Sequence, residues 1–208
     1  MKIIENYYDI VILPPTQVSN YCIKLSKQID NRFGSKFSLG KTENLPHISL
    51  LHTAFSKENF KFLKNKLLPI AKNTKPFEVK IKNFLNYPEH GSVTLEVIPK
   101  ASFLTLYEEV VVATKNLIDT SFDCHAVWNS DKASSKIKKY IDEYTSPMVK
   151  EYFIPHITLN TLKNKDDLLN LEKEIRVKPR NFIVNELTVC TLTKFHTCQD
   201  VIFRILLE

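Results

Sequence analysis

The sequence predicts an α+β protein in which mostly antiparallel sheets are covered by helices. Runs rich in β-branched and aromatic residues alternate along the chain with amphipathic runs at helical spacing. A five-residue pattern also occurs twice, as Pro-His-Ile-Ser-Leu at residues 46–50 and Pro-His-Ile-Thr-Leu at residues 155–159. Each copy precedes an amphipathic run and then two strand-like runs. An imperfect duplication is the simplest architecture that accounts for this order.

In the first half, residues 7–13 predict a strand that stops at two prolines. Residues 17–33 carry apolar side chains at helical spacing and end before a glycine, which is typical of a helix C-terminus. The strand at 45–53 carries the first copy of the pattern, and a helix is expected at 56–72.

Two further strands complete the first half and face each other across a turn-rich loop, which indicates a hairpin. The expected elements are strands at 77–85 and 92–98, a helix at 102–118, a strand at 153–160, a short helix at 166–175 and a final strand pair at 182–193 and 201–207.

The segment 121–152 is undecided from sequence. It contains Trp128, a lysine-rich possible helix at 131–144 and Pro147. An ordinary connection is one interpretation. A lid or substrate loop is the other, because a long segment directly before the second pattern is a usual place for one.

Composition limits the alternatives. A chain of 208 residues with 43% hydrophobic content can bury a core, and it has only three glycines and no linker, so one continuous unit over 1–208 is expected. The net charge of +6 favours anionic partners such as phosphates or RNA, although a merely basic protein fits equally well. Four cysteines lack C-x-x-C spacing, and the start lacks a signal-peptide pattern. We therefore expect a cytoplasmic protein with no membrane partner, and a monomer.

The repeated pattern places polar side chains together. Side chains alternate along a strand, so His47 and Ser49 should share one face and Ile48 the other. His156 and Thr158 should be arranged in the same way. Residues two apart lie roughly 6.5–7 Å from each other along a strand, so an imidazole and a hydroxyl can reach one phosphate-sized group.

These groups suit cleavage of a phosphodiester. One histidine can accept a proton from water while the other donates one to the leaving oxygen, since the imidazole pKa lies near 6.5. The hydroxyls of Ser49 and Thr158 can donate to the non-bridging oxygens. A histidine on a strand is more often structural, and a repeat can be structural too, but core repeats usually preserve apolar rather than polar faces.

The remaining histidines carry no such pattern. Alternation predicts that His52 shares the face of Ile48 and Leu50 and is structural. No histidine or cysteine spacing is typical of zinc, and the chain has no P-loop, dinucleotide-binding or nucleophile-elbow motif. We therefore expect no metal and no cofactor.

The paired motifs resemble those of the two-histidine (2H) phosphoesterase superfamily, in its 2'-5' RNA ligase-like and RNA 2',3'-cyclic phosphodiesterase group. The resemblance covers nearly the whole chain. It implies a bilobal fold with pseudo-two-fold symmetry around a central cleft. It also implies that His47 and His156 are the acid/base pair and that Ser49 and Thr158 bind phosphate. Two departures are a serine in place of the first threonine and the long segment 121–152.

The expected activity is metal-independent hydrolysis of a 2',3'-cyclic phosphate or a 2'-5' linkage in a nucleotide or RNA end. A nucleotide- or RNA-binding module without turnover and an RNA end-joining ligase remain alternatives, and the sequence does not say which histidine is the base. Further candidates could stack on a base or make outer contacts, or could be ordinary core and surface residues: Phe153, Tyr152, Trp128, Phe55 and Lys163.

Overall fold

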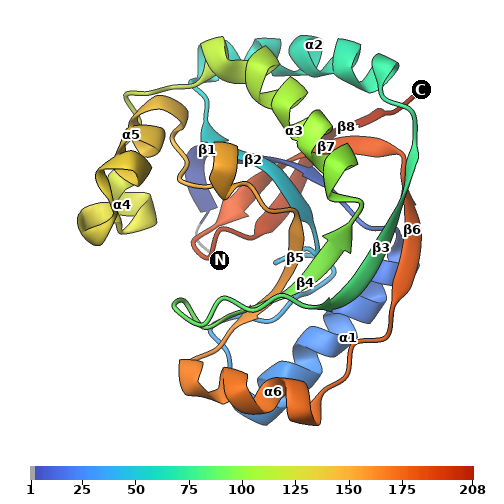
Figure 1. Ribbon diagram of the computed structural model, residues 1–208. Helices are drawn as coiled ribbons and strands as arrows, with labels where there is room; N and C mark the ends of the chain where they lie inside the picture. Colours follow the sequence, from blue (N-terminus) through green and yellow to red (C-terminus); the bar gives the residue numbers. More distant parts are fainter. Residues whose placement is uncertain (1–2) are drawn as a thin grey trace.

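Two four-stranded sheets form the centre of the protein in a computed structural model that describes residues 3–208 (Figure 1). Every strand pairing in them is antiparallel. The first sheet has the order β2 (Ile48–Ala54), β1 (Ile3–Ile12), β7 (Glu186–Thr193), β8 (Cys198–Leu206). The second has the order β5 (His156–Thr161), β4 (Ser92–Ile98), β3 (Phe77–Phe84), β6 (Arg180–Val184).

Helices flank both sheets, which confirms the α+β class. They are α1 (Thr16–Phe33), α2 (Lys57–Asn73), α3 (Lys100–Thr114), α4 (Cys124–Trp128), α5 (Ser135–Tyr144) and α6 (Leu168–Glu174). In Figure 1, α2 and α3 lie side by side at the top, whereas α1 and α6 lie at the bottom. Helix α3 contacts β2 of the first sheet, and α1 contacts β5 of the second. No helix in the described part of the chain is both long and apolar enough to cross a bilayer.

Local sequence explains where several helices begin and end. The hydroxyl of Ser56 accepts a hydrogen bond from the backbone N–H of Asn59 and caps α2. Helix α1 ends at Gly34, whose φ of 72° is easily reached without a side chain. The possible helix at 131–144 starts only at Ser135, because Ser134 caps it by accepting from the N–H of Ile137.

The predicted strand at 182–193 is wrong as a single element. It divides at Asn185 into β6, which pairs with β3 in the second sheet, and β7, which pairs with β1 and β8 in the first. The chain therefore passes from one sheet to the other within this run. No glycine or proline marks the division in the sequence, so composition alone gave no boundary.

The segment 121–152 forms α4 and α5 and packs on the first sheet. The indole of Trp128 donates a hydrogen bond of 2.8 Å to the hydroxyl of Tyr7 in β1. The hydroxyls of Thr53 in β2 and Thr145 lie 2.9 Å apart. The segment is thus hydrogen-bonded to β1 and to β2, the strand that carries the first motif.

Candidate active site

A β-bulge follows the histidine in both motif strands. In the pairing of β1 with β2, Ile10 lies opposite Leu51 and Val11 opposite Ser49, so Leu50 is an extra residue. In the pairing of β4 with β5, Val93 lies opposite Asn160 and Thr94 opposite Thr158, so Leu159 is extra. Both bulges fall three residues after the motif histidine (50 − 47 = 159 − 156 = 3).

The first bulge moves His52 to an unexpected face. An extra residue reverses the alternation of side chains beyond it. His52 therefore lies on the side of Ser49, and its Nε2 is 3.0 Å from the Ser49 hydroxyl. The prediction that His52 shares the face of Ile48 and Leu50 is wrong for this reason. Directly opposite His52 in the register stands Asp9 of β1.

Both motif histidines are held in the same way. Nδ1 of His47 lies 2.6 Å from the carbonyl oxygen of Leu45, and Nδ1 of His156 lies 2.6 Å from that of Ile154. A carbonyl oxygen only accepts, so each Nδ1 must carry the hydrogen. In a neutral ring this leaves Nε2 with a free lone pair, which is the nitrogen available for proton transfer.

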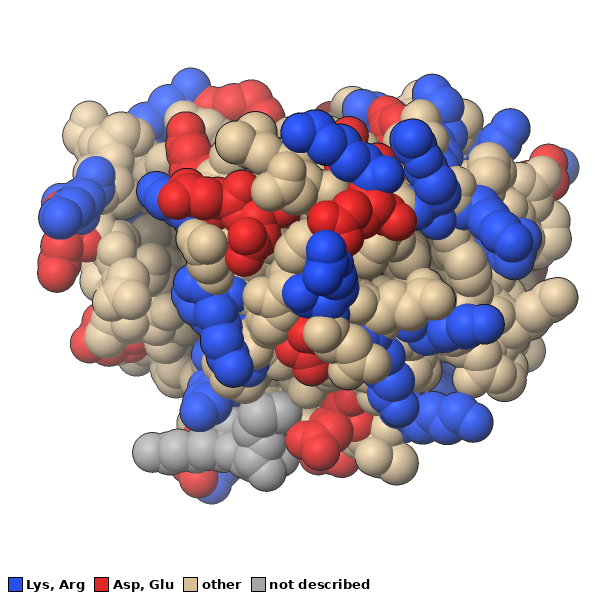
Figure 2. Space-filling model, turned by 90° about the horizontal axis from the view of Figure 1, so that it is seen from below, with Lys and Arg blue, Asp and Glu red and all other residues tan. Residues whose placement is uncertain are grey.

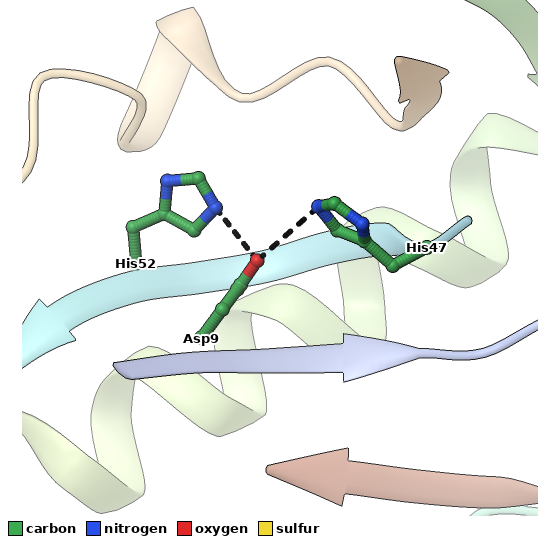
Figure 3. Close-up of side chains that lie close together, drawn as sticks. All are labelled: Asp9, His47 and His52. Carbon is green, nitrogen blue, oxygen red and sulfur yellow. Dashed lines mark ion pairs between the residues drawn. The ribbon is translucent and has the colours of Figure 1, made fainter. Parts of the chain in front are cut away.

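Asp9, His47 and His52 lie close together (Figure 3), and with Ser49, which bonds to Asp9, they form a cluster that we call the Asp9 cluster. The Asp9 carboxylate is fully buried, and its Oδ2 accepts from the Ser49 hydroxyl at 2.7 Å and lies 2.6 Å from His52 Nε2. His47 Nε2 points at the same oxygen from the other side, at 3.7 Å. Asp9 Oδ1 has no hydrogen-bond partner among the described residues. One buried carboxylate thus holds together the side chains of Ser49 and His52 in β2 and of His47, the residue before β2.

The pKa values of the two histidines reflect this arrangement. Burial lowers the pKa of His47, and the nearby Asp9 carboxylate opposes that effect. Burial lowers the pKa of His156 to about 4, and positive charge on His47 or His52 contributes to the lowering. Charge in the first motif therefore affects the pKa of the histidine in the second motif. This is consistent with the direct contact between β2 and β5 of the two sheets.

The surroundings of His156 differ from those of His47. Its register partner is Glu96, whose carboxylate pairs with Lys100 at 3.3 Å and Lys82 at 3.9 Å. The ring of Tyr87, from the loop between β3 and β4, lies with its centroid 5.7 Å from that of His156. The Tyr87 hydroxyl is buried without a hydrogen-bond partner among residues 3–208.

Aromatic rings cover the outer side of the Asp9 cluster. The Trp128 ring stacks on His196 with centroids 4.3 Å apart and on His52 at 5.8 Å. Burial lowers the pKa of His196 to about 4. Trp128, one of the additional sequence candidates, thus reaches the neighbourhood of the histidines by stacking on His52.

The other candidates make different contacts. Phe153 stacks on Tyr107 at a centroid distance of 4.0 Å, and Tyr152 packs edge-on against another tyrosine of the segment 121–152. Phe55 is fully buried in the core and has no surface to offer a base. Lys163 is exposed, and its backbone N–H bonds to the carbonyl of Gly34.

Sequence reasoning missed Asp9, Tyr87 and the site position of His52 and His196. One signal for Asp9 was present, because a charged residue in the middle of the apolar run Tyr-Tyr-Asp-Ile-Val is unusual unless it is paired. The other positions depend on a bulge, a hairpin loop and the β7–β8 turn, and no local pattern marks them.

Fold and site together define an α+β protein in which two histidine-bearing strands, one from each sheet, meet at one site. The chain matches the model of the 2'-5' RNA ligase superfamily over residues 14–194 and belongs to that superfamily. The resemblance to the two-histidine phosphoesterases is thereby confirmed.

Solved structures share the fold. A Thermus thermophilus protein, TT0787, is similar with a TM-score of 0.62 at 15% identity, over 97% of both chains. E. coli LigT in apo form gives a TM-score of 0.61 at 13% identity, over 98% of both chains, and its complex with 3'-AMP gives 0.58 at 14% identity, also over 98% of both. At these identities the likeness concerns the fold. No curated protein sequence matches the chain.

Proposed function

We propose that this protein is a phosphodiesterase that opens a 2',3'-cyclic phosphate or cleaves a 2'-5' linkage in a nucleotide or RNA end, without needing a metal. The observation that carries the proposal is the matched pair of histidines. Both donate Nδ1–H to the carbonyl two residues earlier, so both keep Nε2 for proton transfer at one site. The solved LigT complexes with 3'-AMP, NADP+, ATP and phosphate support a nucleotide-like substrate.

The two histidines have different roles in this proposal. Burial lowers the pKa of both histidines, but Asp9, 3.7 Å from His47 Nε2, opposes this lowering more strongly at His47 than at His156, so His47 is the general acid. His156, with a pKa lowered to about 4, is neutral and is the general base. A water proton passes to His156 Nε2 while the water oxygen attacks phosphorus. The bond from phosphorus to the leaving sugar oxygen then breaks, and that oxygen takes the proton of His47 Nε2.

The hydroxyls of Thr158 and Ser49 complete the proposed phosphate site. Thr158 is the stronger candidate, because the Ser49 hydrogen is already donated to Asp9. A phosphate bound beside His47 and His156 would place its non-bridging oxygens near both motif strands.

Charge is mixed on one face of the molecule. Figure 2 shows basic and acidic side chains interspersed on the face at the bottom of Figure 1. The net charge of +6 is therefore not gathered into one basic surface on that face.

The test is a substrate panel assayed in the presence of chelator. It comprises 2',3'-cyclic nucleotides, 2'-5' linked dinucleotides and RNA halves with a cyclic phosphate end. We expect hydrolysis by the wild type and loss of it in His47→Ala and His156→Ala. His125→Ala is the matched control, since its side chain is 42% exposed and pairs with Asp142 instead. Equal rates in all four proteins would refute the proposal, and a joined RNA product would identify the ligase.

A binding module without turnover is the second candidate. The observation that favours it is the burial of His47, which is only 4% exposed. Tight binding of 3'-AMP to the wild type with no product from any member of the panel would support this alternative over hydrolysis.

A further inference from the structure

Two electron-rich atoms face each other inside the Asp9 cluster. His47 Nδ1 carries the ring hydrogen, so the Nε2 of the neutral ring presents a lone pair to Asp9 Oδ2 at 3.7 Å. The side chains are 5% and 0% exposed, so water screens this contact little. Two lone pairs aimed at each other in a buried place repel, and a proton or a cation between them removes the repulsion.

A third ligand atom lies at the same place. Nε2 of His52 is 2.6 Å from Asp9 Oδ2 and donates its hydrogen to that oxygen; when the hydrogen moves to Nδ1, which has no partner among the described residues, Nε2 is free to bind an ion. The ligand atoms of the three residues all lie within 4.8 Å of one another. Figure 3 shows the two rings approaching the carboxylate oxygen from opposite sides. Imidazole nitrogens and a carboxylate oxygen are the ligands that zinc takes, at about 2.0–2.2 Å.

The spacing needs only small shifts to accept an ion. Ligands about 2.1 Å from a tetrahedral ion lie roughly 3.4 Å from one another. The present separations from Asp9 Oδ2 are 2.6 Å to His52 and 3.7 Å to His47, one shorter and one longer than that value. The ring of His47 is already oriented by the Leu45 carbonyl, as is usual for metal-bound histidines. Ser49 Oγ, 2.7 Å from Asp9 Oδ2, is a neutral oxygen that can serve as a fourth metal ligand.

We propose that the Asp9 cluster binds one divalent transition-metal ion of the zinc type through Asp9, His47 and His52. This site goes beyond the proposed phosphodiesterase activity. The ion takes the His47 lone pair that carries the proton in that reaction, so metal binding and turnover exclude each other and the metal is an inhibitor. Only the inhibition rests on the proposed function; the binding does not.

The test uses the full chain, freed of metal with chelator and then titrated with Co²⁺, which reports tetrahedral coordination by intense visible absorption. We expect one equivalent to bind and Zn²⁺ to displace it. Asp9→Asn and His52→Gln should weaken Co²⁺ binding about tenfold or more. His125→Gln, which removes the exposed His125–Asp142 pair, and His156→Ala, which leaves the three ligands in place, should bind as the wild type does.

A second measurement needs no variant at the site. Paramagnetic Co²⁺ should broaden the ring signals of His47, His52 and Trp128 in the wild-type NMR spectrum before that of His125. No binding to the wild type, loss of binding in His125→Gln, or broadening of His125 first would overturn the proposed site. If hydrolysis is absent from the substrate panel but Co²⁺ binds as described, the metal site stands and the phosphodiesterase proposal fails.

Discussion

The two motif strands, β2 and β5, are alike in backbone and unlike in charge. Each has a bulge three residues after its histidine, and each histidine is tied to the carbonyl two residues earlier. Five residues after the histidine, however, β2 carries His52 opposite Asp9, whereas β5 carries Thr161 opposite Ser92 (52 − 47 = 161 − 156 = 5).

The position of each imidazole and its pKa therefore have different structural causes. The strand and its bulge decide where each imidazole lies, and the Asp9 carboxylate, which stands opposite His52 in the register, raises the pKa of His47 against the effect of burial. The proposed division into acid and base rests on this difference, because the fully buried Asp9 carboxylate lies beside His47, whereas Glu96, opposite His156, is partly exposed and paired with lysines.

The largest effect should come from the histidines themselves. His47→Gln and His156→Gln should each lower kcat/KM about 10²–10⁴-fold, the usual contribution of a general acid or base. In a chelated buffer the wild-type pH profile should be bell-shaped. His156→Gln should remove its acidic limb, because the base must be unprotonated, and His47→Gln its alkaline limb. The opposite pattern would reverse the assignment of acid and base.

The next largest effect should follow from loss of the carboxylate. Asp9→Asn should lower kcat about tenfold and move the alkaline limb to lower pH, because the Asp9 charge raises the pKa of His47. Ser92→Ala is the matched change at the equivalent place in the other half and should leave the profile in position. A limb that stays in place in Asp9→Asn would mean that Asp9 has only a structural role.

A smaller difference should separate the two motif hydroxyls. Thr158→Val should raise KM about tenfold, which corresponds to a lost hydrogen bond to a charged group. Ser49→Ala should change KM less, because its hydrogen is donated to Asp9. Steady-state kinetics on one cyclic nucleotide would measure both. A larger KM effect at Ser49 would show that its hydroxyl turns to the substrate.

The smallest expected effect concerns stability in acid. His196 has a folded-state pKa of about 4, below the usual 6.5, so the unfolded chain takes up its proton first as pH falls. Its contribution is complete above pH 6.5 and is lost between 6.5 and about 4. Urea unfolding of His196→Asn should therefore show about 1–2 kcal/mol less loss of stability between pH 7 and 5 than the wild type. His90→Asn, in an exposed loop, should behave as the wild type.

Local pattern was enough for most of the elements. Helices 17–33 and 56–72 and the hairpin strands at 77–85 and 92–98 were predicted to within one or two residues, because apolar spacing and capping residues act over a few positions. The division at Asn185 was not predicted, since it depends on which sheet each strand joins. Pairing partners far apart in sequence decide that.

The same distinction holds at the site. The sequence alone determined the two histidines, their hydroxyl neighbours and the polar face that each pair shares, because strand alternation is a local property. Only the tertiary structure placed Asp9 beside His47 and brought His52 to the same side. A bulge is set by the register between two strands, and a buried charge is partnered across that register, so neither can be read from one strand.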